Sequence, residues 1–246
     1  MIYIHEKIRS RLKRERVAIG LVRYDETSED RIYRAAEIAD DFARVTVVDE
    51  DDRTAEVLLE LVQQNKVHSA VRGTAGASKL LSLLRKNYSP ARIAVLETPS
   101  RKLFLLSPVG VDEGETVSDR IRLAKFSSEV AEKLGLSKDI AFLSGGRYED
   151  IGRSGAVDRT LADAELCAKI SGGINYEIRL EDAIEKDIII APDGISGNLI
   201  FRALCYLGNG IEYGAVFCNI PYRMVDTSRS QSAEGFARAI ALAVVL

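Results

Sequence analysis

The stretch D-I-I-I-A-P-D-G-I-S-G-N spans residues 187–198 and joins a short apolar run to a glycine-containing turn. The run at 187–191 has the composition of a buried strand, and a helical pattern continues from the turn to residue 206. A strand that passes through such a turn directly into a helix is the repeating unit of parallel α/β sheets. This stretch therefore predicts an α/β fold.

The same unit recurs along the chain. Strands are predicted at 17–22, 45–48, 69–71, 140–143, 176–179 and 215–219. Helices are predicted at 4–16, 28–42, 79–86, 116–134 and 159–170, with two more that begin at 54 and 233. Repeated strand–helix–strand units imply right-handed crossovers, so we expect mostly parallel sheets covered by helices on both faces.

The pattern changes near residue 90. Predicted strands at 92–97 and 103–106 are joined by the short turn 98–101, which suits an antiparallel hairpin. We expect a second lobe to begin there. The predicted division is a first α/β lobe made of residues 1–90 plus 218–246, and a second α/β lobe made of residues 91–217.

Composition excludes several classes of protein. Hydrophobic residues make up 46% of the chain and charged residues 29%, which fits a packed globular protein. The net charge of −3 provides no positive field for nucleic acid. Three widely spaced cysteines form no disulfide framework, and no apolar stretch reaches the roughly 18–20 residues that would span a bilayer. We therefore expect a soluble, cytoplasmic protein without nucleic-acid or membrane partners.

Four strand-to-helix turns share one composition, namely glycine or serine together with arginine or asparagine. They lie at residues 72–78, 144–147, 193–198 and 226–232. Ligands of open parallel sheets bind at the carboxyl ends of strands, where the next helix directs N–H groups at an anion. The predicted ligand-binding residues are Arg72, Gly73, Thr74, Ser144, Gly145, Gly146, Arg147, Asp193, Gly197 and Asn198. The alternative is that these residues only form turns and cap helices.

Common nucleotide and metal motifs are absent from the sequence. It contains neither G-x-x-x-x-G-K-[ST] nor G-x-G-x-x-G after a strand, which disfavours a P-loop enzyme and an ordinary Rossmann dehydrogenase. The two histidines, His5 and His68, have no ligand partner at helical spacing, and the acidic run at 49–52 suits a solvated loop. We expect no metal, and the motifs identify no cofactor.

Two ordered motifs carry a family resemblance. The turn P-D-G-I-S-G-N at 192–198 resembles the P-D-x-x-x-G-N turn of phosphate acetyl- and butyryltransferases, and D-T-S-R-S-Q-S at 226–232 resembles their D-L-S-R-G-C-S segment. The whole chain, with its short first lobe and the string S-G-G-R-Y-E-D-I-G-R-S-G at 144–155, resembles the methanogen MtxX proteins, also called methanogenesis marker protein 4, more closely still. That group has a methyltransferase-related name and itself resembles phosphate acyltransferases.

The resemblance implies an isocitrate and isopropylmalate dehydrogenase-like fold, with two α/β/α lobes, a cleft between them, and a homodimer built through the second lobe. It implies that Ser228 and Arg229 position an acyl phosphate and a thiol, so that CoA or an acyl phosphate is the substrate. Asn198 lies in the matching G-N turn. The acetyltransferases have an acidic base where this chain has Gly235, which leaves the neighbouring Glu234 as the candidate base.

Three functions follow from these observations. The first is a phosphate acyltransferase-like transferase associated with methanogenesis, in which Arg229 and either Arg72 or Arg147 bind a phosphate- or CoA-type ligand. The second is a non-catalytic ligand-binding or assembly factor for methyl-transfer machinery, which the missing acid would suit. The third is a methyltransferase proper, for which the family name is the sole support.

Overall fold

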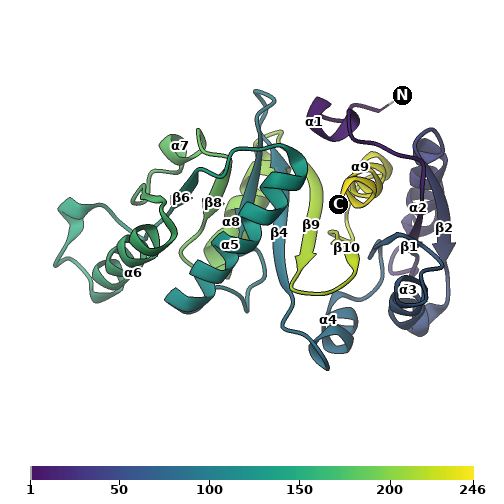
Figure 1. The fold of residues 1–246 in the computed structure, drawn as a ribbon, viewed down its shortest axis with the longest axis horizontal. Coiled ribbons are helices and arrows are strands. Elements are labelled where there is room, and N and C mark those ends of the chain that lie inside the picture. The colour runs from purple at the N-terminus through teal and green to yellow at the C-terminus, as the bar shows by residue number, and fades with distance from the viewer. Residues whose placement is uncertain (1) are drawn as a thin grey trace. The chain divides into compact units, whose positions relative to one another are not determined.

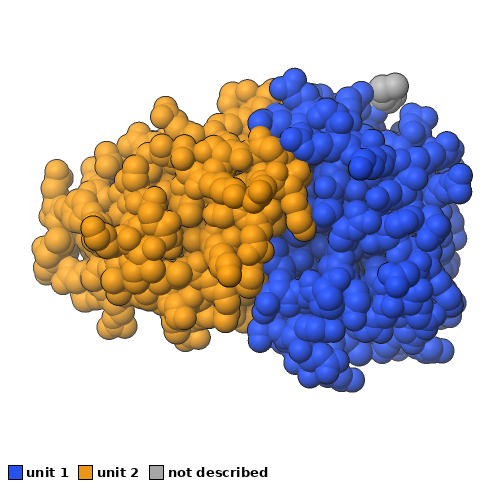
Figure 2. All heavy atoms as spheres, in the orientation of Figure 1, with its two compact units in different colours: residues 1–90, 212–246 blue, residues 91–211 orange. Residues whose placement is uncertain are grey.

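The computed structural model describes residues 2–246, which divide into two compact units (Figure 2). Unit 1 holds the chain up to Pro90 and again from Glu212 to Leu246, and unit 2 holds Ala91–Ile211. Unit 1 is thus built from two separate segments of sequence, whereas unit 2 is one continuous segment.

The sheet of unit 1 has the strand order β2-β1-β3-β10-β9. Strands β2, β1, β3 and β10 run parallel, and β9 runs antiparallel to β10. The strands are β1 (Glu15–Gly20), β2 (Ala43–Val48), β3 (Ser69–Val71), β9 (Ile211–Cys218) and β10 (Arg223–Asp226). Because β10 pairs directly with β3, the last strand of the chain lies inside the sheet that the first strands form.

Helices cover both faces of this sheet (Figure 1). They are α1 (Glu6–Arg9), α2 (Ser28–Ala39), α3 (Thr54–Gln63), α4 (Ala77–Arg85) and α9 (Ala233–Val245), with a 3-10 turn at Asp51–Arg53. One row of inward side chains, Ala18, Ala70 and Met224, joins a cluster with residues of α3 and α4. Helix α9 packs against β1, β3 and β10 and also against α2. The central strands β1 and β3 are therefore buried on both sides over most of their length, as their apolar composition requires, whereas the edge strand β2 alternates between buried and exposed residues.

The sheet of unit 2 has the order β4-β5-β8-β6-β7. Strands β4 and β5 form an antiparallel hairpin, and β5, β8, β6 and β7 are parallel. The elements are β4 (Ala91–Glu97), β5 (Leu103–Ser107), α5 (Val117–Leu134), β6 (Ile140–Phe142), α6 (Gly155–Ser171), β7 (Ile174–Asn175), α7 (Leu180–Ala183), β8 (Ile188–Ile190) and α8 (Gly194–Arg202), with single turns at Tyr148–Asp150 and Ala203–Leu207. The predicted hairpin and the α/β class are both confirmed.

Local sequence explains where the long helices begin and end. The Thr116 hydroxyl caps α5 by accepting from the backbone N–H of Asp119 (3.1 Å), and the Asp119 carboxylate accepts from the backbone N–H of Thr116 (3.3 Å). Gly135 ends α5 in the left-handed conformation, with φ 66°. The long helix expected at 116–134 is therefore formed almost as predicted.

Two expectations for local structure are wrong, and one strand was missed. The helix expected at 4–16 is the single turn α1, because Ile8 is its one fully buried side chain and β1 already begins at Glu15. The strand expected at 176–179 is replaced by the two-residue β7 just before it. Strand β10 was not predicted. In residues 2–246, no helix has the length and apolar character needed to cross a membrane.

Candidate functional site

The first of the four predicted turns follows β3. Gly73 has φ 62°, and a Cβ there would overlap the carbonyl oxygen of Gly20 at the end of β1. Thr74 donates its N–H to the same oxygen (3.0 Å), and its hydroxyl accepts from Val22 N–H (2.7 Å). Gly73 and Thr74 therefore attach the turn after β3 to the end of β1.

Arg72 occupies the end of β3 and is 4% exposed. Each of its three guanidinium nitrogens donates to a protein oxygen: the carboxylate of Asp226, the carbonyl of Thr227 and the carbonyl of Ala75. The hydroxyl of Thr227 donates to Gly73 O (2.9 Å) in return. These bonds join the turn after β3 to the turn after β10. The ligand contact predicted for Arg72 stays a prediction, since a ligand would have to compete with these acceptors.

The turn after β10 carries Ser228, Arg229 and Ser230 towards solvent. The two serine hydroxyls lie 2.8 Å apart, and the Arg229 guanidinium carbon lies 5.2 Å from the centre of the Tyr24 ring. Among residues 2–246, no carboxylate forms an ion pair with Arg229. Arg229 therefore presents an exposed cation beside two hydroxyl groups.

Two residues from the start of unit 1 hold the backbone of this turn. Arg31 donates to Arg229 O (2.9 Å) and to Gln231 O (2.7 Å), and the Tyr24 hydroxyl donates to Arg229 O (2.6 Å). Arg31 also forms an ion pair with Asp25 (2.7 Å). Sequence analysis missed Tyr24 and Arg31. The string R-Y-D at 23–25 was the available signal for Tyr24, although nothing local connects it to a turn 205 residues later, and Arg31 left no such signal.

Loss of hydration acts to raise the pKa of Asp25, but hydrogen bonds from Ser28, Arg31 and Thr27 outweigh it and hold the pKa well below its ordinary value. Asp25 therefore stays ionised across the neutral range, and the Arg31 ion pair persists with it. The backbone of the turn is fixed independently of pH in that range.

Helix α9 begins directly after this turn. Ser232 caps it by accepting from the N–H of Gly235 (3.1 Å). The pKa of Glu234 is lowered, mainly by its own backbone N–H and further by Ser232 and the charges of Arg34 and Arg238, while partial burial opposes the change. A carboxylate with a lowered pKa is a weaker proton acceptor. Glu234 is thus poorly suited to the role of base.

Gly235 stands where an acidic residue was expected from the resemblance. A Cβ at this position would overlap Oε1 of Gln231, whose side chain is buried against the first turn of α9. A side chain at position 235 would therefore require the Gln231 side chain to move to another conformation.

The turn after β6 lies in unit 2. Ser144 is buried and donates its hydroxyl to Gly146 O (3.0 Å), and Gly145 N–H donates to the Thr160 hydroxyl (2.9 Å). Arg147 is exposed, and its N–H donates to Asp150 (2.9 Å). The backbone and hydroxyl groups of this turn that could bind an anion thus have internal partners, and the charge of the exposed Arg147 side chain acts on Asp150.

The turn after β8 is explained by helix packing in unit 2. Asp193 caps α8 by accepting from Ser196 N–H (2.7 Å), and a Cβ at Gly197 would overlap Pro108 O. Asn198 donates its amide to Val109 O (2.9 Å). Gly197 and Asn198 therefore fix α8 against the 108–110 segment.

The structure brings Arg72, Gly73 and Thr74 together with Ser228 and Arg229, whereas the seven other predicted ligand-binding residues belong to unit 2.

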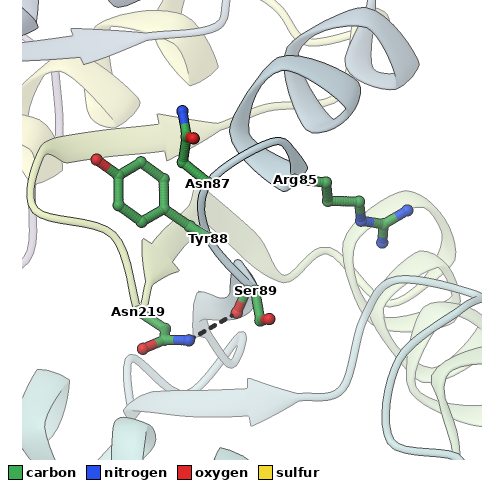
Figure 3. A pocket seen from close by; sticks show the side chains of 5 residues that line it. All are labelled: Arg85, Asn87, Tyr88, Ser89 and Asn219. Atoms are coloured by element: carbon green, nitrogen blue, oxygen red, sulfur yellow. Dashed lines mark hydrogen bonds between the residues drawn. The ribbon is translucent and has the colours of Figure 1, made fainter.

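A cavity of about 440 Å³ lies elsewhere in unit 1 (Figure 3). Its lining is polar and consists of Arg85, Asn87, Tyr88, Ser89 and Asn219. Asn219 donates to Ser89 O (2.9 Å), as the dashed line in Figure 3 marks. The cavity is near the end of α4 and the β9–β10 connection, at the amino end of β10, whereas the 228–230 turn follows its carboxyl end. Across residues 2–246, no group of three or more histidine, cysteine or acidic side chains is placed to hold a metal ion.

Sequence relatives match almost the whole chain. Methyltransferase mtx subunit X of Methanosarcina barkeri is 40% identical over 263 aligned residues, which cover 97% of this chain and 96% of the relative. The protein of the same name from Methanosarcina mazei is also 40% identical, over 97% of this chain and 92% of its own. No family model matches the sequence.

Solved structures confirm the predicted fold. A branched-chain phosphotransacylase from Enterococcus faecalis is similar with a TM-score of 0.70 at 18% identity, covering 93% of this chain and 98% of its own. A phosphotransacetylase from Streptococcus pyogenes has a TM-score of 0.70 at 12% identity, over 97% and 96%. Isocitrate dehydrogenase from Methylococcus capsulatus has a TM-score of 0.52 at 12% identity, over 91% and 83%. At these identities the likeness is one of fold.

Replacing Arg72 with methionine should lower the free energy of unfolding by about 3–5 kcal/mol, because Asp226 would stay buried without its cation. Urea denaturation followed by circular dichroism measures the change. The matched control is Arg14→Met, which removes an exposed ion pair with Asp40 and should cost less than about 1 kcal/mol. Equal losses in the two variants would contradict the structural role of Arg72.

Replacing Glu234 with glutamine should destabilise the protein at pH 7 by about 0.3–1 kcal/mol, the range for a carboxylate at a helix N-terminus. Since the pKa of Glu234 is lowered in the folded state, its contribution is complete above the ordinary value of 4.5 and is lost as the pH falls through the folded value. Urea midpoints at pH 7 and in acid, with Glu37→Gln as the control, measure this. A difference from wild type that grows in acid would refute the assignment.

Proposed function

Because the chain belongs to the methyltransferase mtx subunit X family, we propose that it is a transferase-type protein that binds a phosphate- or CoA-type ligand at the 228–230 turn and the first turn of α9. The catalytic residues proposed from the sequence, Ser228 and Arg229, lie in that turn. The homologues' name supports a role in methyl transfer, and the fold of the phosphotransacylases supports a phosphate-bearing ligand.

The main support for the proposal is that the Arg229 side chain is exposed and its charge is not balanced by a carboxylate in residues 2–246. Its guanidinium is exposed and has no acidic partner in residues 2–246, while the backbone beneath it accepts bonds from Arg31 and Tyr24. A fixed backbone removes one part of the ordering cost of binding an anion, and the remaining part is the ordering of the arginine side chain itself. Its planar donors match two oxygens of a phosphate group.

Other groups nearby favour an anion as well. The hydroxyls of Ser228 and Ser230 can each donate to a phosphate oxygen, and the positive end of the α9 dipole lies directly after them. In a transfer reaction these donors would orient the reacting groups and stabilise negative charge as it develops. CoA and acyl phosphates both carry the phosphate that this arrangement would bind.

A second candidate function is supported by a separate observation. Gln231 fills the space above Gly235, and the pKa of Glu234 is lowered, so the first turn of α9 supplies no effective base. The relatives are named as a subunit, which fits a protein that binds a ligand on behalf of a methyl-transfer complex. Under this alternative the ligand binds as proposed and is not turned over. Residues 2–246 contain no disulfide, which fits a reducing cytoplasm in both cases.

We further propose a homodimer through α8 of unit 2. The fully buried residues of this helix are Gly194 and Gly197, while Ile195 and Leu199 are exposed. Tyr206 and Leu207, in the turn that continues the helix, are exposed too. A helix that exposes its large apolar side chains is stable when a partner covers them, and a second copy of the chain offers the same face.

Wild-type protein should bind inorganic phosphate or CoA, and Arg229→Ala should bind it roughly tenfold more weakly, since a charge-assisted bond worth about 1.5–3 kcal/mol is lost. Arg229→Lys should recover part of the affinity because it keeps the charge without the planar donors. Isothermal titration calorimetry measures this. The control is Arg14→Ala, an exposed arginine before β1. Wild-type affinity in a folded Arg229→Ala variant would remove Arg229 from the site.

Sedimentation velocity should show a dimer for the wild type and a monomer for Leu199→Lys. Leu199 is 63% exposed, so the lysine is accommodated in the monomer, but its charge would be buried in the proposed interface. Circular dichroism should be unchanged. Leu166→Lys, at an exposed apolar position on α6, is the control and should stay dimeric. A monomeric wild type, or a dimeric Leu199→Lys, would refute the α8 interface.

A further inference from the structure

Tyr24 makes two different contacts with Arg229. Its hydroxyl donates to the Arg229 carbonyl at 2.6 Å, and its ring centre lies 5.2 Å from the Arg229 guanidinium carbon. The two residues are 205 positions apart in the sequence. One side chain thus contacts both the backbone and the charged end of the same arginine.

The same ring lies close to a second guanidinium. The Arg31 guanidinium carbon is 5.6 Å from the ring centre, and Arg31 Nη2 donates to the Tyr24 hydroxyl (3.2 Å). Arg31 is neutralised by Asp25, whereas Arg229 has no carboxylate partner in the described chain. Arg31 and Arg229 therefore both lie near the Tyr24 ring, and the acid beside them, Asp25, pairs with Arg31. The surplus positive charge at this point is that of Arg229, and an anion would compensate it.

Stacking against a ring restricts a guanidinium without using its N–H donors. Cation–π attraction acts between the ring and the charge, so the N–H groups at the edge of the guanidinium stay available to a ligand. Tyr24 is 40% exposed and so can fill this role at the protein surface. The hydroxyl bond fixes the backbone from which the arginine extends.

We propose that Tyr24 is the positioning residue of the anion site, holding Arg229 in its ligand-binding conformation, with Arg31 fixing the turn from the other side. This inference rests on the proposed function, because it assumes that Arg229 binds a phosphate group. Tyr24 itself need not touch the ligand. Its effect on affinity should therefore disappear when the Arg229 side chain is absent.

The test is a double-mutant cycle in phosphate and CoA affinity, measured by calorimetry at one salt concentration. Tyr24→Leu should weaken binding roughly tenfold by removing ring and hydroxyl, and Tyr24→Phe should weaken it by a smaller factor because the ring remains. In the Arg229→Ala background, Tyr24→Leu should change affinity less than about twofold. A merely structural role would instead lower the melting temperature equally in both backgrounds and weaken binding in both.

Tyr33→Leu is the matched control. Tyr33 is 45% exposed on α2, and its replacement should leave affinity unchanged. If the wild type binds and Arg229→Ala weakens binding, but Tyr24→Leu binds as the wild type does, the positioning role is wrong while the proposed function stands. An equal loss from Tyr24→Leu in both backgrounds also overturns it. A wild type that binds neither phosphate nor CoA would refute the proposed function and this inference together.

Discussion

Arg72 is a buried cation at the end of β3, and two of its three acceptors, Asp226 and the Thr227 carbonyl, lie on a segment about 154 residues later in the chain. Burying a guanidinium is unfavourable unless its donors are satisfied, so β10 has to deliver Asp226 and the Thr227 carbonyl to that point. This requirement fixes β10 beside β3. It thereby sets the position of everything that follows β10, including the turn with Arg229 and the first residues of α9.

The sequence predicted those parts of the fold that depend on local pattern. The apolar run at 69–71 is β3, and the segment after Thr116 is α5, because continuous burial and helix capping leave local signals. Strand β10 left none, since it has four residues, begins with Arg223 and ends with Asp226. Its neighbour β3 supplies the pairing that makes it a strand. In the same way, the turn at 226–232 could be recognised from its residues, whereas the contribution of Tyr24 depends on packing between distant segments.

Sequence composition alone could not tell a turn that serves helix packing from a turn that is open to a ligand. The G-N pair at 197–198 has the composition of an anion-binding turn, yet in the structure Gly197 lets α8 approach Pro108, and Asn198 binds the Val109 carbonyl. The turn at 226–232, before α9, has the opposite arrangement. There the serine and arginine side chains project to solvent, and the internal contacts are made by the backbone. The direction in which polar groups point distinguishes a packing turn from a turn whose side chains are open to a ligand, and composition does not record that direction.

The insertion of unit 2 between the two segments of unit 1 has a consequence for synthesis on the ribosome. When residue 211 has been made, unit 2 has all of its strands, and it can fold as a contiguous segment. Unit 1 at that moment has β1, β2 and β3 but lacks β10 and α9, so the edge of β3 and one apolar face of its sheet stay open. Arg72 lacks two of its three acceptors until residues 226 and 227 have been made. Until β10 and α9 have been made, the nascent chain therefore carries an incomplete sheet whose open strand edge is available to pair with other chains.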